Sequence, residues 1–347
     1  MEKRRLGNSD IHVSVLCLGS MMYGEQMDHD GAFRQMDVCF DRGINFIDTA
    51  ETYTIPPKPE TQGESERIVG RWIKERGLRD KIILATKVAG RSPMQWLRRG
   101  RNTELSKSQI RFAVDRSLQN LQTDYIDLYQ THWPDRSVQN FGSDIQGYKH
   151  FKEPGVPLEE TLSVLGDLVT AGKIRQVGVS NETPWGVMRL LNASEKTGLP
   201  RIQSIQNAFN LVNRTFEQGL AEIAIEERVG LLAYSPIGQG ALSGKYLNGA
   251  MPKNSRAERF GRFSRYQTPS ADRAIQKYVD IAEKYSVDPS SLAMQFVTTR
   301  PFVTSNIFGA SSMEQLNVIL NSIDIDWTVE LERDVSAVHA EFRNPCP

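Results

Sequence analysis

The chain has 347 residues, and its 42 Lys and Arg balance 42 Asp and Glu, so the formal net charge is zero. This balance disfavours a broad basic surface for nucleic acid or a polybasic patch for membranes. The content of 39% hydrophobic and 24% charged residues is typical of a soluble globular protein, and 26 Gly with 16 Pro exclude collagen-like and low-complexity classes.

The N-terminal residues and the cysteines indicate a compartment. The basic residues 2–5 are followed by Leu6–Asp10, where a signal peptide would need an apolar stretch. No apolar run approaches the roughly 18 residues of a membrane span. Cys17, Cys39 and Cys346 have no neighbour at a metal-binding or redox spacing. We therefore expect a cytoplasmic protein with free, buried thiols and no metal site.

Short apolar segments of strand length recur along nearly the whole chain. Those near Ile83 and Leu232 are apolar without alternation, which is typical of parallel strands covered on both faces. The eight predicted strands are Val13–Leu18, Asn45–Asp48, Ile82–Thr86, Tyr125–Tyr129, Gln176–Val179, Ile202–Ile205, Gly230–Tyr234 and Thr304–Phe308.

Segments with helical periodicity lie between these strands. Ser106 and Gln109 stand at the positions of a capping box, so we expect the Ser106 side chain to cap a helix. Gly172 is predicted to end another helix. Further helices are predicted to begin at Thr183-Pro184 and Asp288-Pro289, and to cover Ser312–Ser322 and Val329–Phe342.

This β-α alternation fits an open doubly wound sheet or a closed (β/α)8 barrel. Eight strands without a linker favour the barrel, so we predict that residues 1–347 form a single domain, although length alone suggests two. Three long segments, 54–63, 133–157 and 246–269, are predicted to be irregular loops. Each follows a strand, so all three would lie on the C-terminal face, where barrel active sites are found.

Polar residues directly follow the predicted strands and would converge on one mouth of the barrel. Asp48 and Lys87 would be partly buried there, so each needs the other for neutralisation. Tyr53 lies five residues after Asp48, within reach of the same mouth. The strand-end positions are Gly19-Ser20, Asp48, Lys87, His132, Ser180-Asn181, Gln206-Asn207, Tyr234-Ser235 and Gly309.

The group of Asp48, Tyr53, Lys87 and His132 indicates a specific chemistry. A phenol has a pKa near about 10, which a neighbouring ammonium would lower. Asp48 would keep Lys87 charged, and His132 could hydrogen-bond the same substrate oxygen. Tyr53 would then act as a general acid toward an oxygen that gains negative charge, as in a carbonyl that receives hydride.

Several runs of the sequence resemble the aldo-keto reductase family. They are Gly43–Tyr53, Ala85–Lys87, Asp124–Trp133, Gly172–Asn181 and Tyr234–Pro236. Within the family, Ile55–Gly63 and Tyr246–Ala250 resemble the Tas-like branch, which is related to potassium-channel β subunits. The resemblance implies the barrel, and it implies catalytic positions for Asp48, Lys87, His132 and the proton donor Tyr53.

A cofactor is expected near the last two strands. Gly238–Gly244, which contains Gln239, has the spacing G-x-G-x-x-x-G and fails as a Rossmann motif, but it follows the seventh strand, where barrels often bind phosphate. Lys245 and Arg256 would supply cations for an anionic ligand.

The resemblance refines these contacts and implies NADP(H). Tyr234 would stack on the nicotinamide, near Asp48, and Arg256 would meet the 2′-phosphate. In place of the acidic residue and Asn that relatives carry, Val318-Ile319 would remove adenine contacts. The other implied contacts are Ser180, Asn181 and Gln206 at the carboxamide, Gly19, Ser20 and Met21 near the nicotinamide, Ser235, Pro236, Ile237 and Lys245 at the pyrophosphate, and Gly309, Ser311 and Gln315 at the adenosine phosphate.

The sequence therefore predicts an oxidoreductase that reduces an aldehyde or ketone with NADPH, reversibly, and acts on small molecules. One alternative is a regulatory subunit that binds NADP(H) with little turnover, and another is an isomerase or lyase with Lys87 as a Schiff base. By position, Met21 or Met22, Tyr23 and Trp133 would line an apolar substrate site. No feature of the sequence predicts an oligomeric state.

Overall fold

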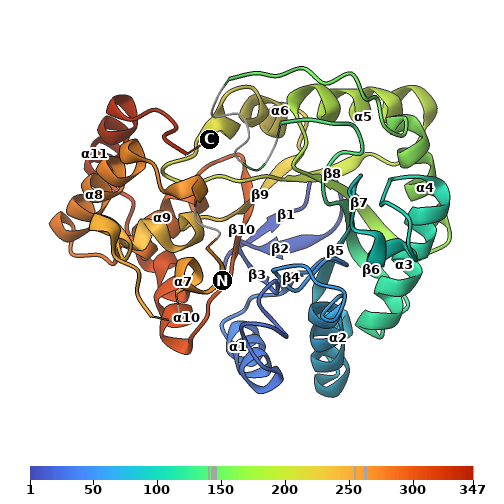
Figure 1. Cartoon of the computed structure of the whole chain (residues 1–347), viewed down its shortest axis with the longest axis horizontal. Helices are drawn as coiled ribbons and strands as arrows, with labels where there is room; N and C mark the ends of the chain where they lie inside the picture. Colours follow the sequence, from blue (N-terminus) through green and yellow to red (C-terminus); the bar gives the residue numbers. More distant parts are fainter. Residues whose placement is uncertain (140, 142–146, 254, 262–263, 347) are drawn as a thin grey trace.

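The computed structural model describes residues 1–139, 141, 147–253, 255–261 and 264–346. Within them, parallel strands close into a barrel in the order β10-β3-β4-β5-β6-β7-β8-β9 (Figure 1). The predicted (β/α)8 barrel is therefore confirmed. Its strands are β3 (Leu16–Gly19), β4 (Phe46–Asp48), β5 (Ile83–Val88), β6 (Ile126–Thr131), β7 (Ile174–Ser180), β8 (Ile202–Gln206), β9 (Gly230–Tyr234) and β10 (Val303–Phe308).

An antiparallel hairpin of β1 (Lys3–Arg5) and β2 (His12–Ser14) precedes the barrel. Leu6 and Val13 from the hairpin are buried against Phe46 and Leu232, so the hairpin closes the N-terminal end. The predicted first strand, 13–18, is therefore wrong at its start. Residues 13–18 form one apolar run in the sequence, but Val13 belongs to the hairpin that closes the barrel, and the barrel strand begins only at Leu16.

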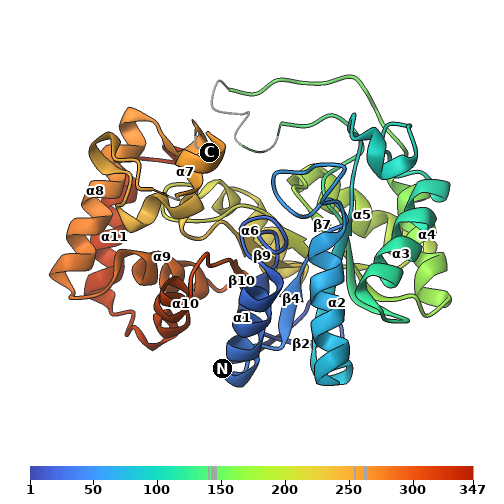
Figure 2. The ribbon, with the colours of Figure 1, turned by 60° about the horizontal axis from the view of Figure 1, so that its bottom comes forward.

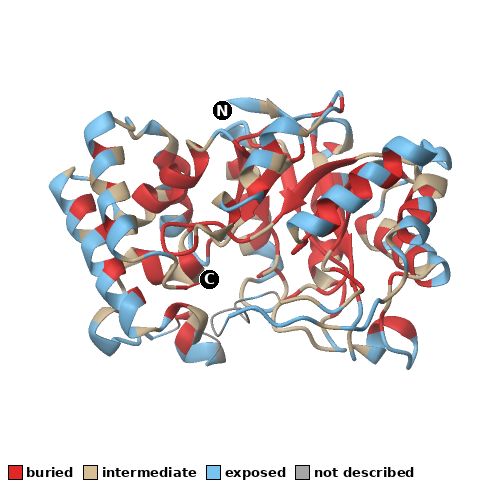
Figure 3. Ribbon diagram, turned by 90° about the horizontal axis from the view of Figure 1, so that it is seen from above, coloured by how far each residue is buried: buried red, intermediate tan, exposed pale blue. Residues whose placement is uncertain are grey.

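Helices cover the outside of the barrel, with their inner faces buried and their outer faces exposed (Figure 3). Two further helices, α8 (Pro269–Lys284) and α11 (Val329–Glu341), pack together at one side (Figure 1). None of the described helices is long and apolar enough to cross a membrane. The surrounding helices are α1 (His29–Asp41), α2 (Glu64–Arg76), α3 (Lys107–Leu121), α4 (Leu158–Thr170), α5 (Pro184–Thr197), α6 (Leu220–Glu226), α9 (Pro289–Thr298) and α10 (Met313–Leu320).

Most of the predicted helix ends are confirmed. The Thr183 hydroxyl accepts a hydrogen bond from the Gly186 amide at the start of α5, and the Asp288 carboxylate accepts two from the first turn of α9. Gly172 follows α4 with a φ of 72°, a left-handed conformation that favours glycine.

The predicted capping box is wrong. Ser106 does precede α3, but its hydroxyl accepts no bond from the helix. The Gln109 side chain turns away from Ser106 and instead bonds the preceding segment, accepting from the Glu104 amide and donating to the Asn102 carbonyl, each at 3.0 Å. The chain before the helix folds back over its first turn, and this tertiary contact replaces the local one.

The three long loops leave the C-terminal ends of β4, β6 and β9, as predicted. The described part of 133–157 contains no helix or strand, and it arches beyond the barrel (Figure 2). The carboxylate of Asp135, near the start of this loop, accepts hydrogen bonds from the Leu105 and Val156 amides at 2.8 and 2.7 Å. It thereby joins the start of the loop to its end and to the segment before α3. The third loop is not irregular throughout, because it contains α7 (Arg256–Phe260). Residues 140, 142–146, 254 and 262–263 of these loops lie outside the described residues.

We expect Gly70→Ala to lower the free energy of unfolding by about 1–3 kcal/mol through overpacking. A Cβ at Gly70 in α2 would lie 2.5 Å from the backbone carbonyl of Leu121, which ends α3 and cannot withdraw. Urea denaturation would measure the change. Gly166→Ala in α4 is the matched control, because its nearest neighbour is the Pro200 ring edge at 3.0 Å. Equal effects of the two substitutions would contradict the prediction.

Candidate active site

The four predicted catalytic residues meet at the C-terminal mouth of the barrel. Asp48 ends β4, Lys87 lies near the end of β5, and His132 directly follows β6. Tyr53 lies in the loop after β4. Asp48 and Lys87 are fully buried, whereas Tyr53 and His132 are half-buried at the surface of the mouth.

The Lys87 ammonium links the members of this group. Its Nζ donates to Asp48 Oδ2 at 2.5 Å and to the Thr49 carbonyl at 2.8 Å, and it lies 3.4 Å from the Tyr53 hydroxyl. A buried charge is tolerated only with such partners. The ammonium is therefore fixed between the carboxylate and the phenol.

Two side-chain amides donate hydrogen bonds to the other carboxylate oxygen of Asp48, Oδ1. Gln130 Nε2 on β6 and Gln206 Nε2 on β8 donate to Oδ1 at 3.1 and 2.9 Å. Gln206 also donates to Gln130 Oε1 at 3.2 Å. The carboxylate thus receives donors from three strands, which hold its plane in one orientation.

Burial dominates the protonation of Tyr53. It raises the pKa of the phenol, and Lys87 lowers that pKa only in part, so the net shift is upward. The expected lowering of the Tyr53 pKa is therefore wrong in direction. Burial lowers the pKa of Lys87, but Asp48 and Tyr53 outweigh it and the net shift is again upward. At neutral pH this leaves a protonated phenol beside a charged ammonium.

His132 is neutral. Burial and the nearby Lys87 charge lower the pKa of its imidazole well below 6.5. Its Nδ1 lies 3.3 Å from the Thr52 hydroxyl, and its ring lies edge-on to Tyr53 with 5.6 Å between centroids. A neutral imidazole can hydrogen-bond the oxygen that Tyr53 faces without adding a charge.

We expect His132→Gln to flatten the acid side of the stability profile. Below pH 6.5 the unfolded chain protonates His132, whereas the folded chain resists protonation because its pKa is lowered. The free energy of unfolding therefore falls as the pH drops, by at most about 1.4 kcal/mol per pH unit, until the folded pKa is reached. Urea denaturation between pH 7 and 5 measures this slope. The exposed His12→Gln is the control, and a slope equal to wild type in His132→Gln would contradict the prediction.

The side chains expected to hold the nicotinamide lie beside the catalytic group. Tyr234 OH donates to Asn181 Oδ1 at 2.6 Å, and Asn181 Nδ2 donates to the His132 carbonyl at 2.9 Å. The Ser180 hydroxyl donates to the Gln206 carbonyl at 2.6 Å. The four predicted residues Ser180, Asn181, Gln206 and Tyr234 are thus brought together.

Three of the predicted cofactor residues have an unusual backbone conformation. Asn181, Ser235 and Gln239 have φ values of 53°, 56° and 57°, a left-handed backbone conformation that residues other than glycine rarely adopt. Such strain concentrates at ligand sites. In addition, Gln239 Oε1 is buried without a hydrogen-bond partner among the described residues. Strained turns and an orphan polar atom after β9 fit a bound dinucleotide.

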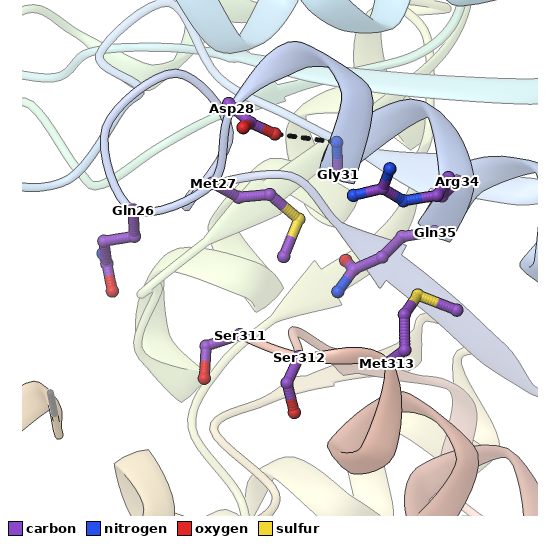
Figure 4. Close-up of a pocket in the computed structure, with 9 residues that line it drawn as sticks. All are labelled: Gln26, Met27, Asp28, Gly31, Arg34, Gln35, Ser311, Ser312 and Met313. Carbon is purple, nitrogen blue, oxygen red and sulfur yellow. Dashed lines mark hydrogen bonds between the residues drawn. The ribbon is translucent and has the colours of Figure 1, made fainter.

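The segment after β10 forms the other end of this region. Gln315 Oε1 accepts from the Ser311 amide and hydroxyl at 3.0 and 2.9 Å, so these two predicted residues are joined. A cavity of about 250 Å³ lies between this segment and the start of α1 (Figure 4). Ser311 and Ser312 line one side of it, and Arg34 lies on the other. Ile319, which the resemblance placed near the adenine, is buried in the core and packs there.

The remaining predicted cofactor residues are distributed around the mouth. The Ser20 amide and hydroxyl both donate to the Asp48 carbonyl, at 3.0 and 3.1 Å. Lys245 Nζ lies 5.2 Å from the centroid of the Tyr246 ring. Arg256 begins α7, and its charge lowers the pKa of Tyr53. Gly19 ends β3, Met21 follows it, Pro236 and Ile237 follow β9, and Gly309 follows β10.

One predicted lining residue is misplaced, and some functional residues were missed. Tyr23 is fully buried and its hydroxyl donates to Gln35 at 3.3 Å, so it belongs to the core and not to the substrate site. Gln130 was missed, although it lies in the run Asp124–Trp133, because nothing local shows which residue its amide would bind. Thr52 was missed although it adjoins Tyr53. Trp133 lies against His132, with 4.8 Å between centroids and the ring planes tilted by 43°, as a lining residue would.

A barrel with these four residues at its C-terminal mouth is typical of one class of enzymes, and comparison of the chain with known proteins identifies that class. The model of the aldo/keto reductase family matches residues 15–334. The chain is 44% identical to Protein tas of Escherichia coli strain K12, over 100% of both chains. It is 41% identical to an aldo-keto reductase of Babesia bovis, over 76% of this chain and 98% of that protein. It is 28% identical to norsolorinic acid reductase B of Aspergillus parasiticus, over 96% of this chain and 82% of that protein.

The chain therefore belongs to the aldo/keto reductase family, and the resemblance to its Tas-like branch is confirmed. Membership supports an oxidoreductase that acts on carbonyl groups. The family generally uses NAD(P)H. Within the described residues, no three His, Cys, Asp or Glu side chains gather as a metal site would require.

Proposed function

We propose that this protein reduces an aldehyde or ketone to an alcohol with NADPH, and that Tyr53 donates the proton. The observation that carries the proposal is the position of Lys87 Nζ, 2.5 Å from Asp48 Oδ2 and 3.4 Å from the Tyr53 hydroxyl. Among the described residues no three His, Cys, Asp or Glu side chains gather here, and the four side chains offer proton transfer and charge stabilisation.

Tyr53 acts as the general acid. Its phenol is protonated at neutral pH, because the ordinary pKa of a phenol already lies well above 7 and burial raises the pKa of Tyr53 further. As the substrate oxygen gains charge, the phenol gives up its proton and Lys87 stabilises the phenolate that forms. Asp48 holds the ammonium, and the neutral His132 hydrogen-bonds the same oxygen. In the reverse direction the phenolate takes the proton of an alcohol.

The nicotinamide, when bound, supplies hydride to the carbonyl carbon. Ser180, Asn181 and Gln206 would hold its carboxamide, and Tyr234 would lie against its ring. The phosphates would meet the segment from Ser235 to Lys245. At the far end, Gly309, Ser311 and Gln315 would hold the adenosine phosphate. Arg256, whose charge acts on Tyr53 in this structure, would have to leave the mouth to meet the 2′-phosphate, a contact that would favour NADP(H) over NAD(H).

The Schiff-base alternative for Lys87 is disfavoured by its charge. Asp48 and Tyr53 raise the pKa of the ammonium, whereas a nucleophilic amine requires a lowered pKa. A regulatory subunit with little turnover remains the second candidate, since the same residues would bind its cofactor.

The substrate is proposed to be a small apolar or aromatic carbonyl. Trp133 lies against His132, and Phe141 lies 6.4 Å from Trp133 between ring centroids. Norsolorinic acid reductase B, a relative, is by its name a reductase. We further propose that the whole chain, 1–347, is one barrel domain and that it works in the cytoplasm.

A panel of aldehydes, ketones and alcohols with NADPH, NADH and their oxidised forms tests the proposal. We expect NADPH consumption on at least one carbonyl class and a higher kcat/KM with NADPH than with NADH. Cofactor binding with negligible turnover across the panel would favour the regulatory subunit. Borohydride labelling of Lys87 would favour the Schiff-base reaction.

A further inference from the structure

A buried ion pair lies beside the loop that carries Tyr53, and the proposed reaction does not use it. Arg98 Nη1 and Nη2 donate to the two carboxylate oxygens of Glu51 at 2.7 and 2.6 Å. The side chains of Glu51 and Arg98 are 3% and 1% exposed. Arg98 ends the 3₁₀ turn Gln95–Arg98, which lies in the connection after β5.

The Glu51 side chain extends the attachment of the loop to β5. The Thr49 amide donates to the Ala85 carbonyl at 2.9 Å, and the Glu51 amide donates to the Lys87 carbonyl at 3.2 Å. Where this backbone pairing stops, Glu51 Oε1 accepts from the Ala89 amide at 2.7 Å. The carboxylate therefore binds the loop to β5 two residues beyond Lys87.

This attachment lies next to the contact that the reaction needs. The Tyr53 amide donates to the Ala50 carbonyl at 3.0 Å, so residues 50–53 form a turn around Glu51. The Lys87 and Tyr53 side chains meet between the same two segments that the bond from Ala89 to Glu51 joins. A shift of Glu51 would move the phenol relative to the ammonium.

Stability alone does not explain a pair this deeply buried. Removing two charges from water costs several kcal/mol per ion, and well-packed apolar residues often serve as well or better. Both carboxylate oxygens of Glu51 are used, one by the Ala89 amide and Arg98 and the other by Arg98. Such bidentate geometry fixes a direction as well as a distance.

We propose that Glu51 and Arg98 are positioning residues, which act as a unit to hold the turn of Tyr53 against β5 and so set the separation of the phenol from Lys87. The proposal rests on the proposed function, because it assumes that Tyr53 donates the proton. Neither residue contacts the substrate oxygen in this scheme.

Glu51→Gln, Arg98→Met and the double variant test the proposal. We expect each single substitution to lower kcat about 100-fold, since small misplacements of reacting groups have effects of this size. The KM for the carbonyl and the Kd for NADPH, measured by fluorescence, should stay within about twofold of wild type. The double variant should lose no more than either single variant, because the pair acts as a unit.

Arg98→Lys keeps the charge but loses the bidentate contact, so it should fold and show an intermediate loss of kcat. Arg300→Met is the matched control. It breaks another bidentate pair, from Arg300 to Glu332, which joins the end of α9 to α11 far along the chain from Asp48, Tyr53, Lys87 and His132. We expect this control to lower the melting temperature and to leave kcat unchanged.

Two outcomes would overturn the proposal: an unchanged kcat in folded Arg98→Met and Arg98→Lys, or losses that multiply in the double variant. The proposed function fails separately, because in that case Tyr53→Phe would itself retain turnover. If Tyr53→Phe is inactive while the Arg98 variants are fully active, only the positioning role is wrong.

Discussion

Tyr53→Phe is expected to lower kcat by between about 100-fold and 10,000-fold, the range that general acid catalysis contributes. The substitution removes only the hydroxyl that lies 3.4 Å from Lys87 Nζ. The ring remains, so its edge contact with His132 and the shape of the mouth are preserved. Initial rates of NADPH consumption at saturating carbonyl measure the effect.

NADPH binding distinguishes this result from a loss of structure. Fluorescence titration should give a Kd for Tyr53→Phe close to that of wild type, because the phenol is not among the residues proposed to hold the cofactor. Tyr125→Phe is a control for the loss of a phenol hydroxyl elsewhere, and it should retain full activity. Turnover by Tyr53→Phe at the wild-type rate would refute the proton-donor role.

Lys87→Met is expected to be both inactive and unstable. It leaves the Asp48 carboxylate buried with amide donors alone, and breaking a buried ion pair in this way costs about 3–5 kcal/mol. The free energy of unfolding from urea denaturation should fall by that amount. The kcat should fall as well, because no cation remains to stabilise the phenolate of Tyr53.

Two further variants separate these effects. The double variant Asp48→Asn, Lys87→Met removes the charges together, so it should regain much of the stability but none of the activity. Lys284→Met breaks the exposed pair from Lys284 to Asp334 and should leave the free energy of unfolding almost unchanged. If Lys87→Met were as stable as Lys284→Met, the buried pair would not have the energetic role assigned to it.

The barrel and the convergence of Asp48, Tyr53, Lys87 and His132 could be predicted because both leave strong local signals. Unbroken apolar segments mark strands that are covered on both faces, and an ionisable residue at or shortly after the end of such a segment is expected at the mouth. Asp48, Lys87 and His132 each fit this rule. Tyr53 was found through its distance from Asp48, and the runs shared with the family placed it more firmly.

What failed depended on contacts between distant segments. The sign of the Tyr53 pKa shift depends on how much structure covers the phenol, which the spacing of Lys87 and Asp48 does not reveal. Gln109 binds a preceding turn that only the folded chain brings over the helix. Tyr23 follows shortly after a barrel strand in the sequence, which suggested a place at the mouth, but its hydroxyl donates to Gln35 in the core.

The positioning pair was also beyond a reading of the sequence. Glu51 lies within the run that carries Tyr53, but nothing local connects it with Arg98, 47 positions later. Arg98 is one of several arginines in a polar stretch, and only the fold shows that this one is buried. Gln130 has the same difficulty, because nothing next to it in β6 indicates its partner and its acceptor Asp48 is 82 positions away.

The carboxylate of Asp48, which receives side chains from β5, β6 and β8, has a consequence for how such a protein can diversify. The orientation of this carboxylate is set by residues of the barrel strands, so exchange of the loop 133–157 should leave the orientation unchanged. A graft of that loop from a relative should change which carbonyl compounds are accepted while the ammonium of Lys87 stays where it is. We therefore expect specificity to change with this loop while the contacts of Asp48 and Lys87 are retained.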